Sequence, residues 1–107
     1  MKRIVAYKSY YKDFVASLSR EEQLKIRRVL ILFETNDLLP LHFIKYIDDS
    51  LYELRITLPT REARLFFIYD GDTMVVLFNC FIKKTQKTPQ KEIEKAKRIK
   101  KEYYEGK

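Results

Sequence analysis

The chain has 107 residues, which is enough for one hydrophobic core, and we expect residues 1–107 to form a single domain. Its net charge is +7, it has one Cys and one His, and no apolar run approaches the roughly 20 residues of a membrane span. These features argue against a membrane protein, an internal disulfide and a Cys/His zinc site, so we expect a cytoplasmic protein that needs no metal or other cofactor.

The first part of the chain predicts one strand and two helices. In residues 3–10, Arg3, Val5 and Tyr7 fall on one side and Ile4, Ala6 and Lys8 on the other, a pattern that suits a strand. Four apolar residues then recur at the spacing of a short helix: Tyr11, Phe14, Val15 and Leu18. Ser19 lies three residues before Glu22 in a capping box that opens a second helix, whose apolar run from Val29 to Phe33 predicts burial against a sheet.

The middle of the chain predicts a loop and then three strands. Asn36 and Asp37 end the second helix, and residues 37–50 are predicted to be a loop. The three strand segments are residues 51–58, 62–70 and 73–83. Short turns rich in Pro, Gly and Asp separate these segments and predict an antiparallel meander.

The C-terminal segment predicts a charged helix and completes an α+β fold. Thr88 and Pro89 are predicted to be its N-cap and first residue. Its inward stripe consists of Ile93, Ala96, Ile99 and Tyr103. Residues 83–107 hold ten Lys or Arg against four Asp or Glu, whereas residues 1–82 hold twelve against eleven. Such a basic patch attracts phosphate backbones, although a solvated helix that keeps the protein soluble explains the charge equally well.

Charged residues interrupt two of the predicted strands. Glu53 and Arg55 lie on the face opposite the apolar residues of their strand, and Arg64 has apolar neighbours on both sides. A charge in such a place is costly unless it is paired or kept wet in a groove. An ion pair of Arg55 or Arg64 with Glu53 across neighbouring strands would satisfy it. The third strand brings Lys83 and Lys84 toward the same edge, which favours a phosphate-binding site.

The ordered segments LYELRI, RLFFIY, FIKKTQKTP and EIEKAKRIKKEYY resemble the HigB branch of the RelE/ParE superfamily of bacterial toxins. The resemblance covers residues 51–104 and implies a RelE-like fold. It implies the toxin of a type II toxin-antitoxin system, an mRNA endoribonuclease that works on the ribosome by metal-independent attack of the ribose 2′-OH and so inhibits translation and growth. It further implies a helix-turn-helix antitoxin, a monomeric free toxin and an oligomeric toxin-antitoxin complex.

The resemblance also implies roles for individual residues. Arg55 and Arg64 stand at family positions that act on the phosphate, and a planar guanidinium can grip phosphate oxygens with two parallel hydrogen bonds. Lys83, Lys84 and Lys87 match a basic segment that in relatives contributes phosphate contacts or a catalytic group. The predicted catalytic residues are Arg55, Arg64, Glu53, Lys83 and Lys84. The predicted RNA-binding residues are Lys87, Lys91, Arg98 and Tyr104.

The chain departs from the family pattern in its acid and base residues. Some relatives have Lys at the position of Glu53, and several use a His or Tyr near the end of the sheet, where this chain has Thr85 and Gln86. We prefer the interpretation that Glu53 orients Arg55 or Arg64 and that a lysine gives what acid or base help there is. The alternative is that Glu53 is the general base.

Two other functions are compatible with these residues. ParE-type relatives share the architecture but act on DNA gyrase, and they lack the cluster of basic residues. A basic protein that binds RNA or the ribosome without catalysis would carry the same charge and would bind with strong salt dependence.

Four further residues receive weaker predictions. His42 is interpreted as a packing residue of a loop rather than an acid or base, and Cys80 as a small buried hydrophobic residue. Tyr103 is expected to pack on the sheet. Tyr104 faces away from the helix stripe and is the better candidate for stacking on a base.

Overall fold

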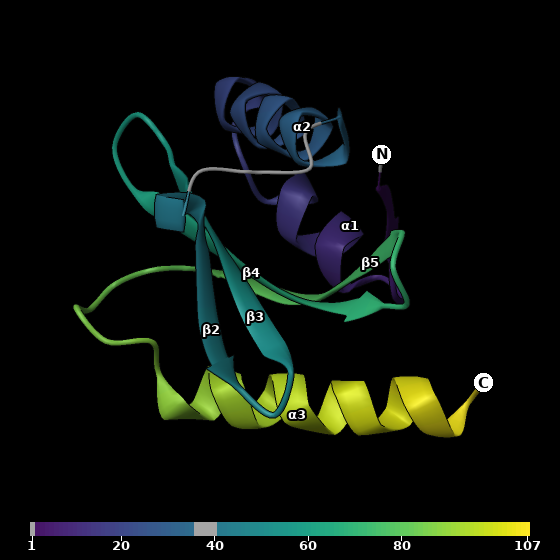
Figure 1. Cartoon of the computed structure of the whole chain (residues 1–107). Helices are drawn as coiled ribbons and strands as arrows, with labels where there is room; N and C mark the ends of the chain where they lie inside the picture. The colour runs from purple at the N-terminus through teal and green to yellow at the C-terminus, as the bar shows by residue number, and fades with distance from the viewer. Residues whose placement is uncertain (1, 36–40) are drawn as a thin grey trace.

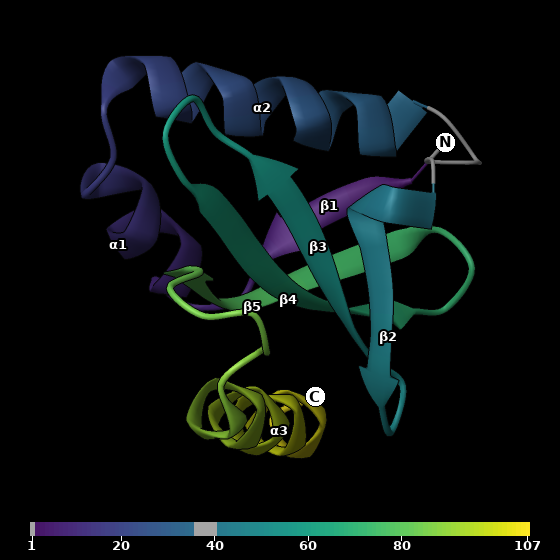
Figure 2. The ribbon, with the colours of Figure 1, turned by 90° about the vertical axis from the view of Figure 1, so that its left-hand side faces the viewer.

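The computed structural model describes residues 2–35 and 41–107. Its elements are β1 (Arg3–Ala6), α1 (Tyr10–Ala16), α2 (Arg20–Thr35), a 3-10 helix η1 (Leu41–Phe43), β2 (Ile44–Asp48), β3 (Leu51–Thr57), β4 (Glu62–Asp70), β5 (Met74–Ile82) and α3 (Gln90–Glu105). Figure 1 shows α1 and α2 on one side of the sheet and α3 on the other, and Figure 2 shows the same layers after a quarter turn. The predicted α+β fold is confirmed. The predicted helix end at Asn36 and Asp37 lies outside the described residues.

The sheet has five strands in the order β1-β5-β4-β3-β2. The predicted meander is confirmed, because β3 pairs with β4 and β4 with β5, both antiparallel. The N-terminal strand β1 pairs in parallel with β5, so that Arg3 aligns with Met74 and Ala6 with Leu77. This pairing makes the last strand of the chain an interior strand of the sheet.

The prediction of a loop over residues 37–50 is wrong for residues 44–48, which form β2 on the edge of the sheet. This strand pairs antiparallel with β3, and the Tyr46 ring lies 5.3 Å from its cross-strand partner Tyr52. Asp49 and Ser50 have φ of 50° and 60°, as the two residues of a type I′ hairpin turn do. The usual sequence signal for that turn is Asn-Gly or Asp-Gly. The sequence here is Asp-Ser, so the hairpin was not predicted.

Each face of the sheet has its own apolar core. Leu54, Ile56 and Leu58 pack with Ile26 and Phe33 of α2 on the first face, as their alternation predicts. Helix α2 begins where expected, because the Ser19 N–H donates to Glu22 Oε1 at 3.0 Å and the Glu22 N–H donates to Ser19 Oγ at 3.1 Å. The predicted capping box is therefore confirmed.

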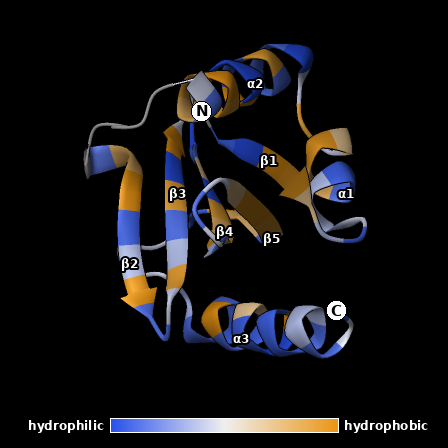
Figure 3. Ribbon diagram, turned by 45° about the vertical axis from the view of Figure 1, so that its right-hand side comes forward, coloured by the Kyte–Doolittle hydropathy of each residue, from blue (hydrophilic) through white to orange (hydrophobic). Residues whose placement is uncertain are grey.

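Helix α3 covers the second face of the sheet. All four residues of its predicted stripe contribute to that core, with Ala96 and Ile99 buried and Ile93 and Tyr103 partly buried. Figure 3 shows hydrophobic colour on α3 only as short patches between hydrophilic stretches. The predicted N-cap is wrong, because Pro89 rather than Thr88 occupies that position. None of the helices in the described ranges is long and apolar enough to cross a bilayer.

Candidate functional site

The charged residues of β3 and β4 gather on the face of the sheet that also carries α3. The register places Arg55 directly opposite Arg64, and Thr57 opposite Glu62. The residues that pack under α3 lie further along the strands, at Phe66 and beyond. Residues 83–89, which we call the basic strap, form the connection from β5 to α3 that Figure 1 shows. Thr88 of this strap reaches Glu53, so the strap lies against the charged residues of the sheet. We call Glu53, Arg55, Glu62 and Arg64 the sheet cluster.

The centre of the sheet cluster is the ion pair of Glu53 with Arg64. Glu53 is fully buried and the Arg64 side chain is only 6% exposed. Arg64 Nη1 donates to Glu53 Oε1 at 2.7 Å, and Arg64 Nη2 lies 2.8 Å from Glu62 Oε1. The second Glu53 oxygen accepts a hydrogen bond from the Thr88 hydroxyl at 2.8 Å. Arg64 is thus paired, as its apolar sequence neighbours required, and both Glu53 oxygens are engaged.

Arg55 is held more loosely than Arg64. Its Nε lies 3.6 Å from Glu53 Oε1, beyond hydrogen-bond distance, and its side chain is 34% exposed. That buried Nε has no hydrogen-bond acceptor among the described residues. The buried Nε of Arg64 is also without an acceptor among these residues, but both terminal nitrogens of Arg64 are paired with carboxylates. Arg55 is the more exposed of the two arginines, so it is the member of the cluster that can reach an external acceptor.

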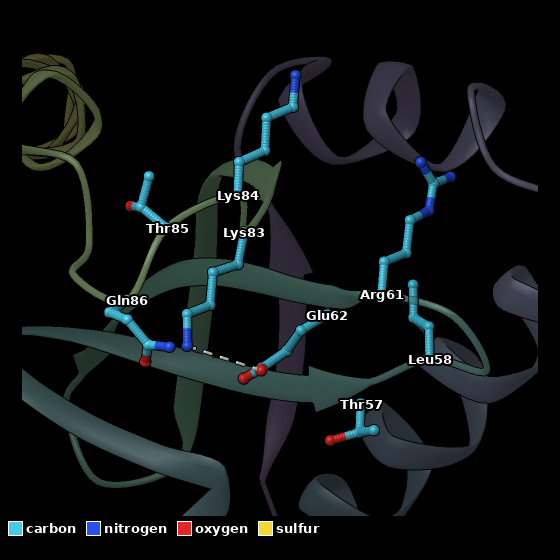
Figure 4. A pocket seen from close by; sticks show the side chains of 8 residues that line it. All are labelled: Thr57, Leu58, Arg61, Glu62, Lys83, Lys84, Thr85 and Gln86. Atoms are coloured by element: carbon cyan, nitrogen blue, oxygen red, sulfur yellow. Dashed lines mark ion pairs between the residues drawn. The ribbon is translucent and has the colours of Figure 1, made fainter.

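Lys83 joins the cluster through Glu62. The Lys83 N–H donates to the Glu62 carbonyl oxygen at 2.8 Å, and its ammonium lies 3.9 Å from Glu62 Oε2. Figure 4 shows Lys83 reaching toward Glu62, while Lys84 and Arg61 extend to the other side. The sequence prediction that the end of the third strand meets the arginines therefore holds for Lys83, through a shared carboxylate.

A groove of about 530 Å³ opens beside these residues. It is lined by Thr57, Leu58, Arg61, Glu62, Lys83, Lys84, Thr85 and Gln86. Arg61 and Lys84 also line a neighbouring groove of about 480 Å³ that reaches Phe14 of α1. Three basic side chains line the larger groove, but Arg61 is paired with Glu22 and Lys83 lies 3.9 Å from Glu62 Oε2. Lys84, which has no ion-pair partner among the described residues, is the charge that the groove offers to an anion.

Arg61 is a site residue that the sequence reading missed. Its Nε donates to Glu22 Oε2 at 2.7 Å and its Nη2 donates to Glu22 Oε1 at 2.9 Å. This bidentate contact, together with the N–H at Ser19, lowers the pKa of Glu22 to about 2. No local signal could have found the pair, because Glu22 stands at the start of α2 and Arg61 in the turn before β4.

The predicted RNA-binding residues of helix α3 make no hydrogen bond or ion pair with the sheet cluster among the described residues. Lys91 and Arg98 are exposed, and Tyr104, which is 44% exposed, lies roughly 20 Å along the helix axis from Gln90. Two lysines of α3 instead pair with the turn between β2 and β3: Lys97 lies 2.8 Å from Asp48 Oδ1, and Lys100 lies 3.5 Å from Asp49 Oδ2. The charge of residues 83–107 is therefore partly neutralised within the protein.

The remaining sequence candidates lie outside the cluster. Exposed His42 sits beside Phe43 with ring centroids 4.4 Å apart. Cys80 is partly buried, and its burial raises the pKa of the thiol to about 12. Tyr103 packs on the sheet as predicted and donates a hydrogen bond to Asp70; burial and this bond raise its pKa to about 12. In the described ranges no group of three or more His, Cys, Asp or Glu is placed to hold a metal ion.

Comparison with known proteins assigns the chain to a family. The family model described as "Phage derived protein Gp49-like (DUF891)" matches residues 13–101, which is most of the chain and includes the sheet cluster and the basic strap. A search of curated proteins found no match. The family is associated with toxin-antitoxin systems and is similar to RelE and HigB, so an antitoxin is implied as a partner. The chain belongs to the Gp49-like family of phage-derived proteins.

Proposed function

We propose that the protein is the toxin of a type II toxin-antitoxin system and that it cleaves mRNA on the ribosome. The observation that supports this best is the position of Arg55: its guanidinium lies beside the buried Glu53 carboxylate, and its side chain is 34% exposed whereas that of Arg64 is 6% exposed. It stands opposite Arg64 and near a groove lined by basic side chains. Membership of a toxin-antitoxin-associated family supports the same function.

The proposed reaction is attack of a ribose 2′-oxygen on the adjacent phosphorus, with departure of the 5′-oxygen. It forms a 2′,3′-cyclic phosphate and a free 5′-hydroxyl, and the proton lost by the 2′-OH is returned overall to the leaving oxygen. Arg55 would bind the phosphate oxygens as negative charge develops on them. Lys83 or Lys84 would donate to the phosphate or to the leaving oxygen, as their place beside the groove allows.

In this scheme Glu53 and Arg64 are positioning residues. Glu53 is fully buried and its oxygens are engaged by Arg64 and Thr88, so it is poorly placed to take a proton from a substrate. Both terminal nitrogens of Arg64 are paired with carboxylates. Glu53, fixed in place by Arg64, would attract the Arg55 guanidinium and orient it. We therefore propose for Glu53 the orienting role that the sequence favoured.

The test is cleavage of one defined mRNA in a translating extract, with new 5′ ends mapped. We expect cuts at codon-phased positions that need ribosomes, and a loss of about 10²- to 10³-fold in rate for Arg55→Ala, the scale for removal of one charge-stabilising donor. Arg28→Ala is the matched control, because it removes an exposed arginine from α2, which packs on the opposite face of the sheet. We also expect Lys83→Ala with Lys84→Ala to weaken growth arrest on induction.

The outcomes separate the candidate functions. Intact mRNA with the wild-type protein would overturn the nuclease proposal, and inhibition of DNA gyrase would then identify a ParE-type activity. Salt-dependent RNA binding without cleavage would identify a non-catalytic binding protein. Equal cleavage by Arg55→Ala and wild type would leave the nuclease but remove Arg55 from its site.

We also propose the assembly that the resemblance implies. The antitoxin would be a helix-turn-helix protein, the free toxin a monomer and the toxin-antitoxin complex an oligomer in the cytoplasm. Light scattering of the toxin alone and of the co-expressed complex measures both states directly, and a stable toxin dimer would contradict the proposal.

A further inference from the structure

A second basic pocket lies between β2 and the start of α3. Its volume is about 440 Å³, within the range of small-ligand sites. Lys45 contributes from β2, and Lys87, Thr88 and Gln90 contribute from the basic strap and the first residue of α3. Gln86 lines both this pocket and the groove of Figure 4, so the two are neighbours along the strap.

The charges in this pocket favour an anion. Lys45 and Lys87 are both exposed, and neither has an ion-pair partner among the described residues. Asp48 is the pocket's carboxylate, and it is already paired with Lys97, whose Nζ lies 2.8 Å from its Oδ1 and 2.9 Å from its Oδ2. Two lysines are thus left to meet a ligand, with amide and hydroxyl groups beside them.

The pocket is also tied to the sheet cluster by the strand register. Lys45 is the cross-strand partner of Glu53, and therefore a diagonal neighbour of Arg55 on the same face of the sheet. Diagonal neighbours on adjacent antiparallel strands lie roughly 7–8 Å apart at Cα. Thr88 lines the pocket while its hydroxyl reaches Glu53. An extended RNA strand with one phosphate at Arg55 can therefore place a neighbouring phosphate within reach of Lys45.

We propose that the pocket formed by Lys45, Lys87 and their neighbours binds a second RNA phosphate, next to the one held at Arg55. The inference rests on the proposed function for the identity of the polymer. Lys45 is then a binding residue that favours RNA with at least two phosphates. The basic strap would run alongside the RNA and contact more than one of its phosphates.

The experiment measures binding rather than cleavage. Fully 2′-O-methylated RNA cannot supply a 2′-OH nucleophile, so fluorescence anisotropy with a labelled dinucleotide and a labelled hexanucleotide reports affinity alone. We expect Lys45→Ala to weaken hexanucleotide binding and to leave dinucleotide binding unchanged. For Lys45→Ala with the hexanucleotide, the slope of log K against log salt should be shallower than that of wild type by about 0.7. The ratio of wild-type to variant affinity should therefore fall by about 2.6-fold when the salt is raised from about 50 to about 200 mM. Lys87→Ala should act similarly, and Arg28→Ala should change neither.

The results distinguish this inference from the proposed function. Lys45→Ala and Lys87→Ala proteins that bind the hexanucleotide with wild-type affinity and slope would overturn the second phosphate site, even if ribosome-dependent cleavage is found. Equal weakening of both oligonucleotides would overturn it as well, because it would place Lys45 at the first phosphate. Hexanucleotide binding that depends on Lys45, in a protein that cuts no mRNA, would overturn the proposed function and keep the site.

Discussion

Replacing Glu53 by Gln should show how strongly the buried ion pair supports the sheet cluster. The substitution keeps the shape and removes the charge, so that Arg64 retains only Glu62, whose side chain is 32% exposed. Breaking a buried pair costs about 3–5 kcal/mol, and we expect about 3 kcal/mol because this second partner remains. With an unfolding entropy of about 2.1 cal/mol/K per residue over 107 residues, the melting temperature should fall by about 13 °C.

Thermal unfolding followed by circular dichroism measures this loss directly. Glu62→Gln is the matched control, and we expect it to cost about 1 kcal/mol or less because the Glu62 side chain is 32% exposed and its ion pairs are partly screened by solvent. A Glu53→Gln protein within about 1 kcal/mol of wild type would refute the reasoning, since it would show that Glu62 alone satisfies Arg64.

A double substitution then separates stability from activity. Glu53→Leu with Arg64→Met replaces the whole pair by apolar side chains of similar size, and such replacements are often neutral or stabilising. We expect its stability to return to within about 1 kcal/mol of wild type. Cleavage should stay low, because Arg55 loses the carboxylate beside it. Restored cleavage in this stable variant would contradict a positioning role for the pair.

Three further predictions use other contacts. Thr88→Val should lower the free energy of unfolding by about 1.5–3 kcal/mol, since it removes a hydrogen bond to the Glu53 carboxylate; urea denaturation measures this, and a smaller loss would mean that water replaces the hydroxyl. Folding lowers the pKa of Glu22 from 4.5 to about 2, so the ionised Glu22 stabilises the folded state above pH 4.5, and this stabilisation should disappear as the pH falls to 2. The melting temperatures of wild type and Glu22→Gln should therefore converge between pH 4.5 and pH 2. Melting temperatures that change in parallel over this range would contradict the prediction. Ile99→Ala should cost about 2–4 kcal/mol by leaving a cavity under α3, whereas the exposed control Ile31→Ala should cost little.

The sequence predicted the parts of the fold that depend on local pattern. Strong alternation in β3 and the capping box at Ser19 needed no distant information, and both were confirmed. Strand β2 has five residues on the sheet edge and pairs on only one side, so its pattern was too short to separate from a loop. Missing β2 also meant missing Lys45, which lies directly across from Glu53.

Contacts between segments that are distant in the sequence were the second feature that could not be predicted from the sequence. Thr88 has the sequence context of an N-cap, but its hydroxyl bonds a carboxylate of β3 instead. The positive charge of α3 suggested a uniform basic surface, while Lys97 and Lys100 pair with acidic residues of the β2–β3 turn. A Lys in a helix looks the same in the sequence whether or not tertiary structure brings a carboxylate to it.

The parallel pairing of β1 with β5 has a consequence for folding during synthesis. Strand β5 lies between β1 and β4 in the sheet. Strand β1 is synthesised first but pairs with β5, so it cannot join the sheet until β5 has been synthesised. Pairing across most of the chain gives a high contact order, which slows folding because a long loop must be ordered before its contacts form. Thr88 completes the support of Glu53 later still. A chain of this fold therefore stays without its full set of contacts at the sheet cluster until almost all of it has been made.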